Sequence, residues 1–169
     1  MNQKKKIEEY DLFNDLSDEW WNEDGKFKVL HQIQPLRIQY IKEQIKDNSL
    51  KNLDILDVGC GGGLICEPLA RLEANVTGID FVRKNIKAAQ EHAKSKSLKI
   101  NYKCQDIENI NFDKKYDLII IFEVLEHLDD WRNFIIRIKE NLKSNGQIII
   151  STINRNLISK YLVNTFKKD

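Results

Sequence analysis

The chain has 169 residues, and its hydrophobic share of 41% is sufficient for a folded core, which excludes a wholly disordered protein. Its 27 basic and 26 acidic side chains give a formal net charge of +1, so the composition argues against nucleic acid as a partner. The three cysteines are an odd number without a CxxC pair. They fit neither a disulfide framework nor a zinc ribbon, and we expect a reducing, cytoplasmic location.

The first 50 residues are expected to form a helical cap. Residues 1–9 are charged and lack the apolar segment of a leader peptide, and no apolar run approaches the length of about 20 residues that spans a membrane. Apolar residues then recur at helical spacing over residues 10–21 and 35–45. The sequence therefore predicts helices in this region, in a protein that is soluble or at most peripheral on a membrane.

Residues 51–153 show an alternation of apolar strands and helical segments. Strands are expected over 53–58, 75–79, 100–104, 116–122 and 147–152, and helices over 64–72, 84–95 and 131–142, with Gly146 ending the last helix. Runs such as 118–121 are apolar throughout, so both faces of the sheet must be covered. The sequence predicts a single α/β domain with a doubly wound sheet of about five parallel strands.

A glycine-rich turn follows the first expected strand. Gly59, Gly61 and Gly63 alternate with other residues, and Asp80 ends the second strand. Glycines let the backbone approach a ligand at a helix N-terminus, and a carboxylate at the next strand end can accept ribose hydroxyl protons. Leu64 occupies the sixth position of the GxGxxG dinucleotide fingerprint, where Gly or Ala is expected. The turn therefore favours S-adenosylmethionine over a nicotinamide dinucleotide, which stays an alternative, as does a turn that needs glycine for strain alone.

Three further positions at strand ends fit the same cofactor. Asp106 follows the third strand and could accept a hydrogen bond from an adenine amino group, while the backbone of Ile107 offers the ring a donor. Phe122 ends the fourth strand beside the glycine turn. Each of these residues alone is compatible with ordinary surface or core, and their positions at neighbouring strand ends give them weight.

An acidic and histidine cluster follows the fourth strand directly. Glu123, Glu126 and His127 have the spacing that places three side chains on one face of a helical turn. Such a set could bind a divalent cation that lowers the pKa of a phenol, or His127 could remove the phenol proton itself. The alternative is a solvated helix start that carries charges.

Together these motifs resemble the ubiquinone-biosynthesis O-methyltransferases, over a likeness that runs from about residue 20 to residue 156. The resemblance rests on Trp20-Trp21, Gly25-Lys26-Phe27, Leu30-His31, Pro35-Leu36-Arg37, and residues 56–63, 76–80, 123–127 and 151–156.

The resemblance implies a class I methyltransferase (Rossmann-like) fold and polyprenylated phenol or catechol substrates. It also implies cofactor contacts at Arg37, Gly59, Asp80 and Phe122, and a magnesium-linked role for residues 123, 126 and 127. An arginine suits the methionine carboxylate of the cofactor, because its guanidinium can bind a carboxylate with two parallel hydrogen bonds.

The end of the sequence departs from the family pattern, because family members continue into antiparallel strands that this chain is expected to lack. Residues 154–169 have the pattern of an amphipathic helix that either lies on the inner face of a membrane through residues 155–168 or covers the open sheet edge. We expect a phenol O-methyltransferase of ubiquinone biosynthesis. The alternative is a non-catalytic module that binds the cofactor and other quinone-biosynthesis enzymes.

Overall fold

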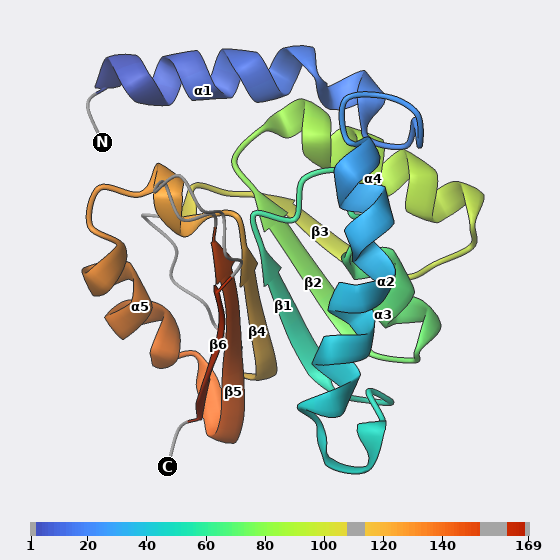
Figure 1. The fold of residues 1–169 in the computed structure, drawn as a ribbon, viewed down its shortest axis with the longest axis vertical. Coiled ribbons are helices and arrows are strands. Elements are labelled where there is room, and N and C mark those ends of the chain that lie inside the picture. Colours follow the sequence, from blue (N-terminus) through green and yellow to red (C-terminus); the bar gives the residue numbers. More distant parts are fainter. Residues whose placement is uncertain (1–2, 108–113, 153–161, 168–169) are drawn as a thin grey trace.

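The computed structural model describes residues 3–107, 114–152 and 162–167. Its strands are β1 (Asp54–Val58), β2 (Asn75–Asp80), β3 (Asn101–Cys104), β4 (Tyr116–Phe122), β5 (Leu142–Thr152) and β6 (Leu162–Lys167). Within the described residues these strands form one sheet in the order β3-β2-β1-β4-β5-β6 (Figure 1). The first five strands pair in parallel. This arrangement confirms the expected doubly wound sheet, whose order reverses between β1 and β4.

Helices cover both faces of the sheet. They are α1 (Gln3–Asp15), α2 (Lys28–Glu43), α3 (Cys66–Arg71), α4 (Arg83–Ser95) and α5 (Trp131–Lys139). Both helical stretches expected before residue 50 are present, although the first helix begins earlier than expected and is followed by a short 3-10 turn, Ser17–Glu19. Among the helices of the described ranges, none combines the length and apolar character that a membrane crossing requires.

The apolar strands divide their side chains between two cores. Ile55, Leu118 and Ile120 face α2, α3 and α4, whereas the intervening Leu56 and Ile119 belong to the core that contains Phe134 and Ile138 of α5. All of these side chains are buried. The two faces account for the uninterrupted apolar runs of the sequence, because successive strand residues point to opposite sides of the sheet.

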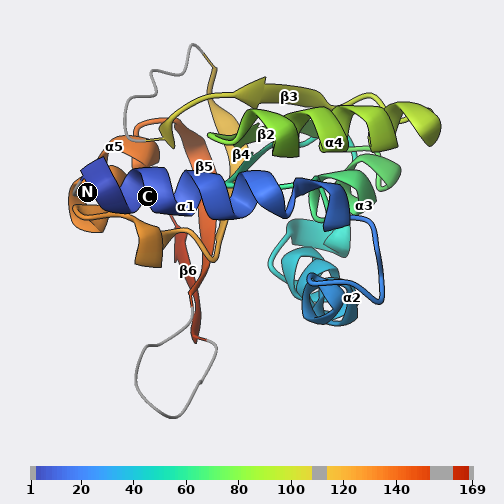
Figure 2. The same ribbon diagram turned by 90° about the horizontal axis from the view of Figure 1, so that it is seen from above.

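Helix α1 crosses the edge of the sheet at which the parallel strands end (Figures 1 and 2). The ring of Tyr10 contacts Phe81 after β2, with 6.0 Å between the centroids, and the ring of Phe13 contacts His127 after β4 at 5.8 Å. The helix therefore bridges the two halves of the sheet above the point where the strand order reverses.

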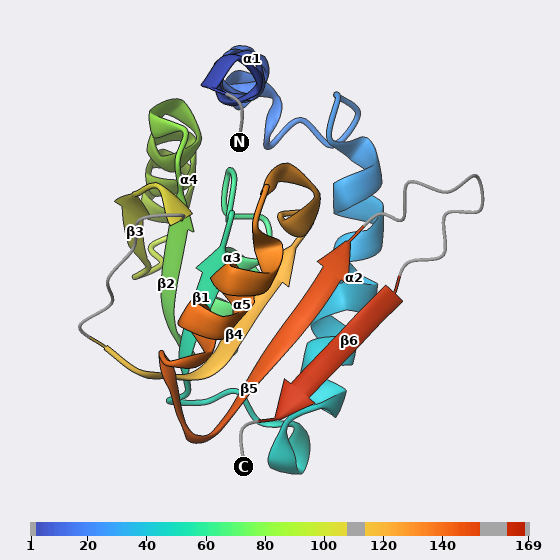
Figure 3. The same cartoon turned by 90° about the vertical axis from the view of Figure 1, so that its left-hand side faces the viewer.

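The C-terminal segment differs from the expected amphipathic helix. Residues Leu162–Lys167 form β6, which runs antiparallel to β5 with Thr152 opposite Leu162 and Gln147 opposite Lys167 (Figure 3). The predictions of a helix here and of missing antiparallel strands are therefore wrong for residues 162–167. The physical reason is that pairing satisfies the backbone groups on the outer edge of β5. The remainder of the segment, 154–161 and 168–169, lies outside the described residues.

The role predicted for Gly146 is also wrong. Helix α5 ends at Lys139, and Gly146 lies within β5, which begins at Leu142. A side chain at position 146 would meet the carbonyl oxygen of Tyr116 at 2.9 Å. The glycine is thus needed for close approach between β4 and β5, near a register shift of that pair.

Candidate cofactor and active site

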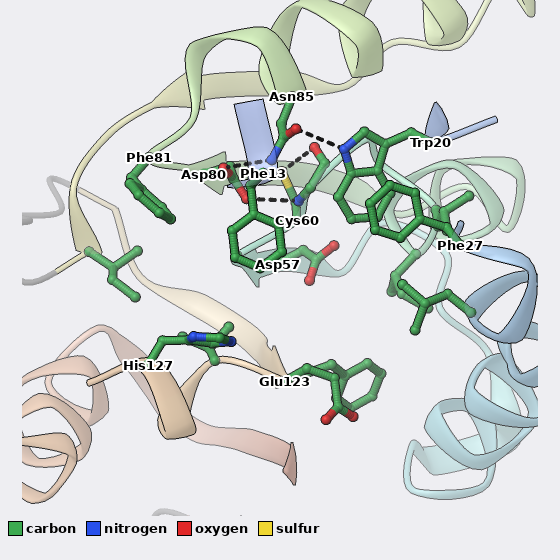
Figure 4. A pocket seen from close by; sticks show the side chains of 18 of the residues that line it. Phe13, Trp20, Phe27, Asp57, Cys60, Asp80, Phe81, Asn85, Glu123 and His127 are labelled. Carbon is green, nitrogen blue, oxygen red and sulfur yellow. Dashed lines mark hydrogen bonds between the residues drawn. The ribbon is translucent and has the colours of Figure 1, made fainter. Parts of the chain in front are cut away.

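A cavity of about 340 Å³ lies at the carboxyl ends of the parallel strands (Figure 4). Ligands of doubly wound sheets bind at this edge, near the reversal of strand order. The cavity is lined by every residue that the sequence singled out for the site: Arg37, Gly59, Gly61, Asp80, Asp106, Ile107, Phe122, Glu123, Glu126 and His127. The residues that the sequence motifs predict as site residues therefore lie together around one cavity.

The glycine turn after β1 is shaped by positive backbone angles and by close neighbours. Gly59, Gly61 and Gly63 have φ angles of +71°, +52° and +89°, a region that residues with a Cβ rarely adopt. A Cβ at Gly61 would lie 2.3 Å from the indole of Trp20. Gly61 therefore makes room for a tryptophan and also has a backbone angle that favours glycine, whereas the reasons predicted from the sequence were close approach of a ligand or, alternatively, backbone strain alone.

Asp80 lies at the end of β2. Its side chain is buried and lines the cavity. Its Oδ2 accepts a hydrogen bond from the backbone N–H of Gly61 at 3.0 Å, and its Oδ1 accepts from Val82 N–H at 2.8 Å. Burial raises the pKa of this carboxyl, and the N–H donors act in the opposite direction. An ionised carboxylate has about four acceptor positions. The N–H groups of Val82, Gly61 and the Asn85 side chain occupy three of them, so one position on Oδ2 is left for a ribose hydroxyl.

Two residues that the sequence analysis did not assign to the site complete the surroundings of Asp80. The side-chain amide of Asn85 donates to Asp80 Oδ1 at 3.3 Å, and Trp20 Nε1–H donates to Asn85 Oδ1 at 2.8 Å. Trp20 stood out in the sequence only as part of a family motif. No periodicity or spacing distinguished Asn85, since it lies in the first turns of α4 like any polar helix residue.

Arg37 reaches the cavity from α2 and meets the end of β4. Its guanidinium carbon lies 4.9 Å from the centroid of the Phe122 ring, and its Nη2 lies 2.5 Å from Oε1 of Glu123. The same Glu123 oxygen accepts a bond from the hydroxyl of Ser151 at 2.7 Å. The cation is therefore held in the lining of the cavity by a carboxylate and an aromatic face.

Glu123 is in an unfavourable environment for a carboxylate. It has a φ of +56°, and its Oε2 is buried without a hydrogen-bond partner among the described residues. Burial raises its pKa, and the nearby charge of Glu126 acts in the same direction, while Ser151 and Arg37 oppose the shift. Strained backbone and an unsatisfied buried oxygen on one residue are typical of functional positions.

The other two members of the acidic and histidine cluster lie on the 3-10 turn Leu125–His127. Glu126 Oε2 accepts a bond from the hydroxyl of Thr152 at 2.8 Å, and His127 contacts the ring of Phe13. In the described part of the chain, no three His, Cys, Asp or Glu side chains are grouped closely enough to hold a metal ion. The predicted trio therefore lines one cavity, but the structure does not gather it into a metal site.

Asp57 lies below the glycine turn at the end of β1 and is buried. It accepts a hydrogen bond from the thiol of Cys66 at 3.1 Å. Burial is the main cause that raises its pKa to about 7, and the carboxylate of Asp80 adds to the effect while Arg37 opposes it. Burial thus raises the pKa of both carboxyls, Asp57 and Asp80, in the lining of this cavity.

The comparison with a protein-family model matches residues 56–150 to the methyltransferase domain. The chain is 47% identical over 154 residues to the ubiquinone biosynthesis O-methyltransferase of Rickettsia felis, with 90% of this chain and 62% of that protein covered. It is 46% identical to the protein of the same description from Pelagibacter ubique, with 92% and 67% covered. The chain thus spans about 62 to 67% of the length of these two curated relatives.

Solved structures support the fold. The magnesium protoporphyrin IX methyltransferase from Synechocystis PCC 6803, solved with bound SAM, superposes with a TM-score of 0.74 at 23% identity, covering 95% of this chain and 81% of that one. A methyltransferase from Clostridium acetobutylicum described as S-adenosylmethionine-dependent has a TM-score of 0.64 at 26% identity, covering 86% and 58%. The chain belongs to the methyltransferase domain family, and it is a homologue of the ubiquinone biosynthesis O-methyltransferases.

Proposed function

We propose that the protein binds S-adenosylmethionine in this cavity and transfers its methyl group to a phenol or catechol hydroxyl of a polyprenylated ubiquinone precursor. The observation that carries the proposal is the arrangement of opposite charges around one cavity. Arg37, paired with Glu123, and the buried carboxylate of Asp80, bonded to Gly61 of the glycine turn, both line this cavity. The description shared by the curated relatives supports the substrate class.

The residues of the cavity fit the parts of the cofactor. Asp80 Oδ2 has one free acceptor position for a ribose hydroxyl, and the guanidinium of Arg37 suits the methionine carboxylate. Asp106 and the backbone of Ile107 line the cavity after β3, where an adenine ring would find an acceptor and a donor. When bound, the cofactor supplies a methyl group on a positively charged sulfur. Because the cofactor carries no phosphate, its site needs no phosphate-binding loop.

His127 is the residue that we assign to proton transfer. It lines the cavity on the side of η4 (Leu125–His127), across from Asp80 (Figure 4). It accepts the proton of the substrate hydroxyl, and the phenolate oxygen that remains forms a bond to the methyl carbon as the carbon–sulfur bond breaks. The products are the methyl ether and S-adenosylhomocysteine.

Magnesium dependence stays a prediction. Glu123 is held by Arg37 and Ser151, and Glu126 is held by Thr152, so these carboxylates are not assembled as metal ligands in this structure. The proposed proton transfer uses His127 and needs no metal step. Membrane contact and other enzymes as partners also stay predictions, since residues 153–161 lie outside the described part of the chain.

The test is methyl transfer from S-adenosylmethionine to a short-chain demethylubiquinol analogue, measured with magnesium and with a chelator. We expect a methylated product, and turnover that depends on magnesium would restore the metal role of residues 123, 126 and 127. The non-catalytic alternative predicts cofactor binding without any product. Binding without product would contradict the proposed methyl transfer, and absence of both would contradict the cofactor site as well.

A further inference from the structure

A chain of hydrogen bonds connects the N-terminal segment to the carboxylate of Asp80. Trp20 Nε1–H donates to Asn85 Oδ1 at 2.8 Å, Asn85 Nδ2–H donates to Asp80 Oδ1 at 3.3 Å, and Asp80 Oδ2 accepts from Gly61 N–H at 3.0 Å (Figure 4). The chain joins a segment before α2, the first turns of α4, the end of β2 and the glycine turn. It therefore ties four separate parts of the sequence to one side of the cavity.

The members of this chain are shielded from water. Trp20, Asn85 and Asp80 are 8%, 2% and 6% exposed, respectively. Water could therefore not easily replace a hydrogen bond lost at Asn85. The remaining buried donor or acceptor would be left without a partner, which is energetically unfavourable.

The indole of Trp20 is fixed in place by packing as well as by its hydrogen bond. It is stacked on Phe27 with 3.9 Å between the ring centroids and an interplanar angle of 5°. It also covers the glycine turn so closely that a Cβ at Gly61 or Gly62 would lie 2.3 Å from it. Its N–H group therefore has one defined direction.

That direction decides how the amide of Asn85 is oriented. An indole N–H is a donor only, so the group facing it must be the amide oxygen of Asn85. The amide nitrogen, which is a donor, is then left to face Asp80. If the amide turned over, its oxygen would face the carboxylate and its nitrogen would face the indole N–H, and both contacts would be repulsive.

We propose that Trp20 and Asn85 are positioning residues for the ribose-binding carboxylate: Trp20 fixes the amide of Asn85, which in turn holds Asp80 in the rotamer that receives the ribose of S-adenosylmethionine. This inference rests on the proposed cofactor site. It adds that the N-terminal segment before α2 acts on cofactor affinity through Asp80 rather than by touching the ribose.

The test measures binding of S-adenosylhomocysteine and of its 2′-deoxy analogue by titration calorimetry. Asn85→Leu removes both side-chain bonds, and Trp20→Phe removes the N–H donor while keeping a ring against Phe27. The matched controls are Asn75→Leu, at the opposite end of β2, and Trp131→Phe, at the exposed start of α5. Circular dichroism establishes that each variant is folded.

We expect Asn85→Leu to weaken binding of S-adenosylhomocysteine by about tenfold, which is the scale of one hydrogen bond to a charged group. Trp20→Phe is expected to weaken it by about threefold or more, and the controls are expected to leave it unchanged. The diagnostic result is the ratio of the two affinities. If Asp80 is misplaced, the wild-type preference for the 2′-hydroxyl shrinks in both variants, whereas a general loosening of the fold weakens both ligands equally.

The outcomes separate this inference from the proposed function. Failure of the wild-type protein to bind S-adenosylhomocysteine would overturn the cofactor site itself. Wild-type binding together with an unchanged preference for the 2′-hydroxyl in folded Asn85→Leu and Trp20→Phe would overturn the positioning role alone. If Asn85→Leu does not fold, the ratio in Trp20→Phe decides the question.

Discussion

Arg37 on α2 and Glu123 after β4 form an ion pair in the lining of the cofactor cavity, with 2.5 Å between Nη2 and Oε1. Both side chains are largely buried, at 14% and 20% exposure. The arginine that we assign to the methionine carboxylate thus already has an acidic partner in this structure. Cofactor binding would exchange one carboxylate for another at the same guanidinium.

We predict that Arg37→Lys weakens binding of S-adenosylhomocysteine by about tenfold, because a lysine cannot bind a carboxylate with two parallel hydrogen bonds or stack on Phe122 in the same way. Calorimetry measures the effect. Arg132→Lys is the control, since Arg132 is exposed and stacks on Trp131. Equal affinity of Arg37→Lys and wild type would remove Arg37 from the cofactor site.

His127→Gln separates binding from chemistry. We expect turnover on the demethylubiquinol analogue to fall by about 100-fold, the lower range for loss of a general base. Affinity for S-adenosylhomocysteine should stay within about twofold, because the residue lies across the cavity from Asp80. A variant that keeps full turnover would show that another group removes the proton.

Because Trp20 packs against the glycine turn, we expect the effect of Gly62→Ala on stability to depend on whether Trp20 is present. Gly62 has an ordinary backbone angle, yet a Cβ there would lie 2.3 Å from Trp20. Gly62→Ala should therefore lower the free energy of unfolding by about 1–3 kcal/mol, the usual cost of overpacking. In a Trp20→Ala background the same change should cost much less. Urea unfolding of the single and double variants measures this, and additive costs would show that the clash is not the cause.

The raised pKa of Asp57 predicts a pH-dependent stability. Since the folded carboxyl titrates at about 7 and an unfolded one near 4, the folded state binds more protons between these values. Stability contributed by this group is thus full below about pH 4 and is lost as the pH rises through 7, with a slope of at most about 1.4 kcal/mol per pH unit.

Asp57→Asn should flatten this part of the profile, because the amide does not ionise and its oxygen can still accept the bond from Cys66. Thermal unfolding of both proteins from pH 5 to pH 8 provides the comparison. Parallel profiles of the wild type and the variant would refute a raised pKa at this position.

The parallel core was predictable because local pattern and final environment agree there. Residues 118–121 are apolar on both faces, and the structure covers both faces with helices. Strand β6 was missed for the opposite reason. Residues 162–167 have a spacing compatible with a helix, and their conformation is decided by pairing with β5, which no local pattern records.

The site, too, has residues that the local sequence pattern predicts and residues that only distant contacts define. Strand ends and glycines placed Asp80, Phe122 and the cluster after β4, because the carboxyl ends of parallel strands meet at one edge. Asn85 was missed, since its importance depends on Trp20, which lies 65 positions away in the sequence. A packing contact with that distant ring is likewise one reason why Gly61 and Gly62 lack side chains.

The most direct test of the cofactor site is calorimetric titration of S-adenosylhomocysteine into the wild-type protein and Asp80→Ala, with Asp117→Ala at the opposite end of the sheet as the control. We expect the wild type and the control to bind alike. We expect Asp80→Ala to bind at least about tenfold more weakly, because the bond from a ribose hydroxyl to a charged acceptor is lost. Equal binding by Asp80→Ala and the wild type would contradict the assignment of this carboxylate to the ribose.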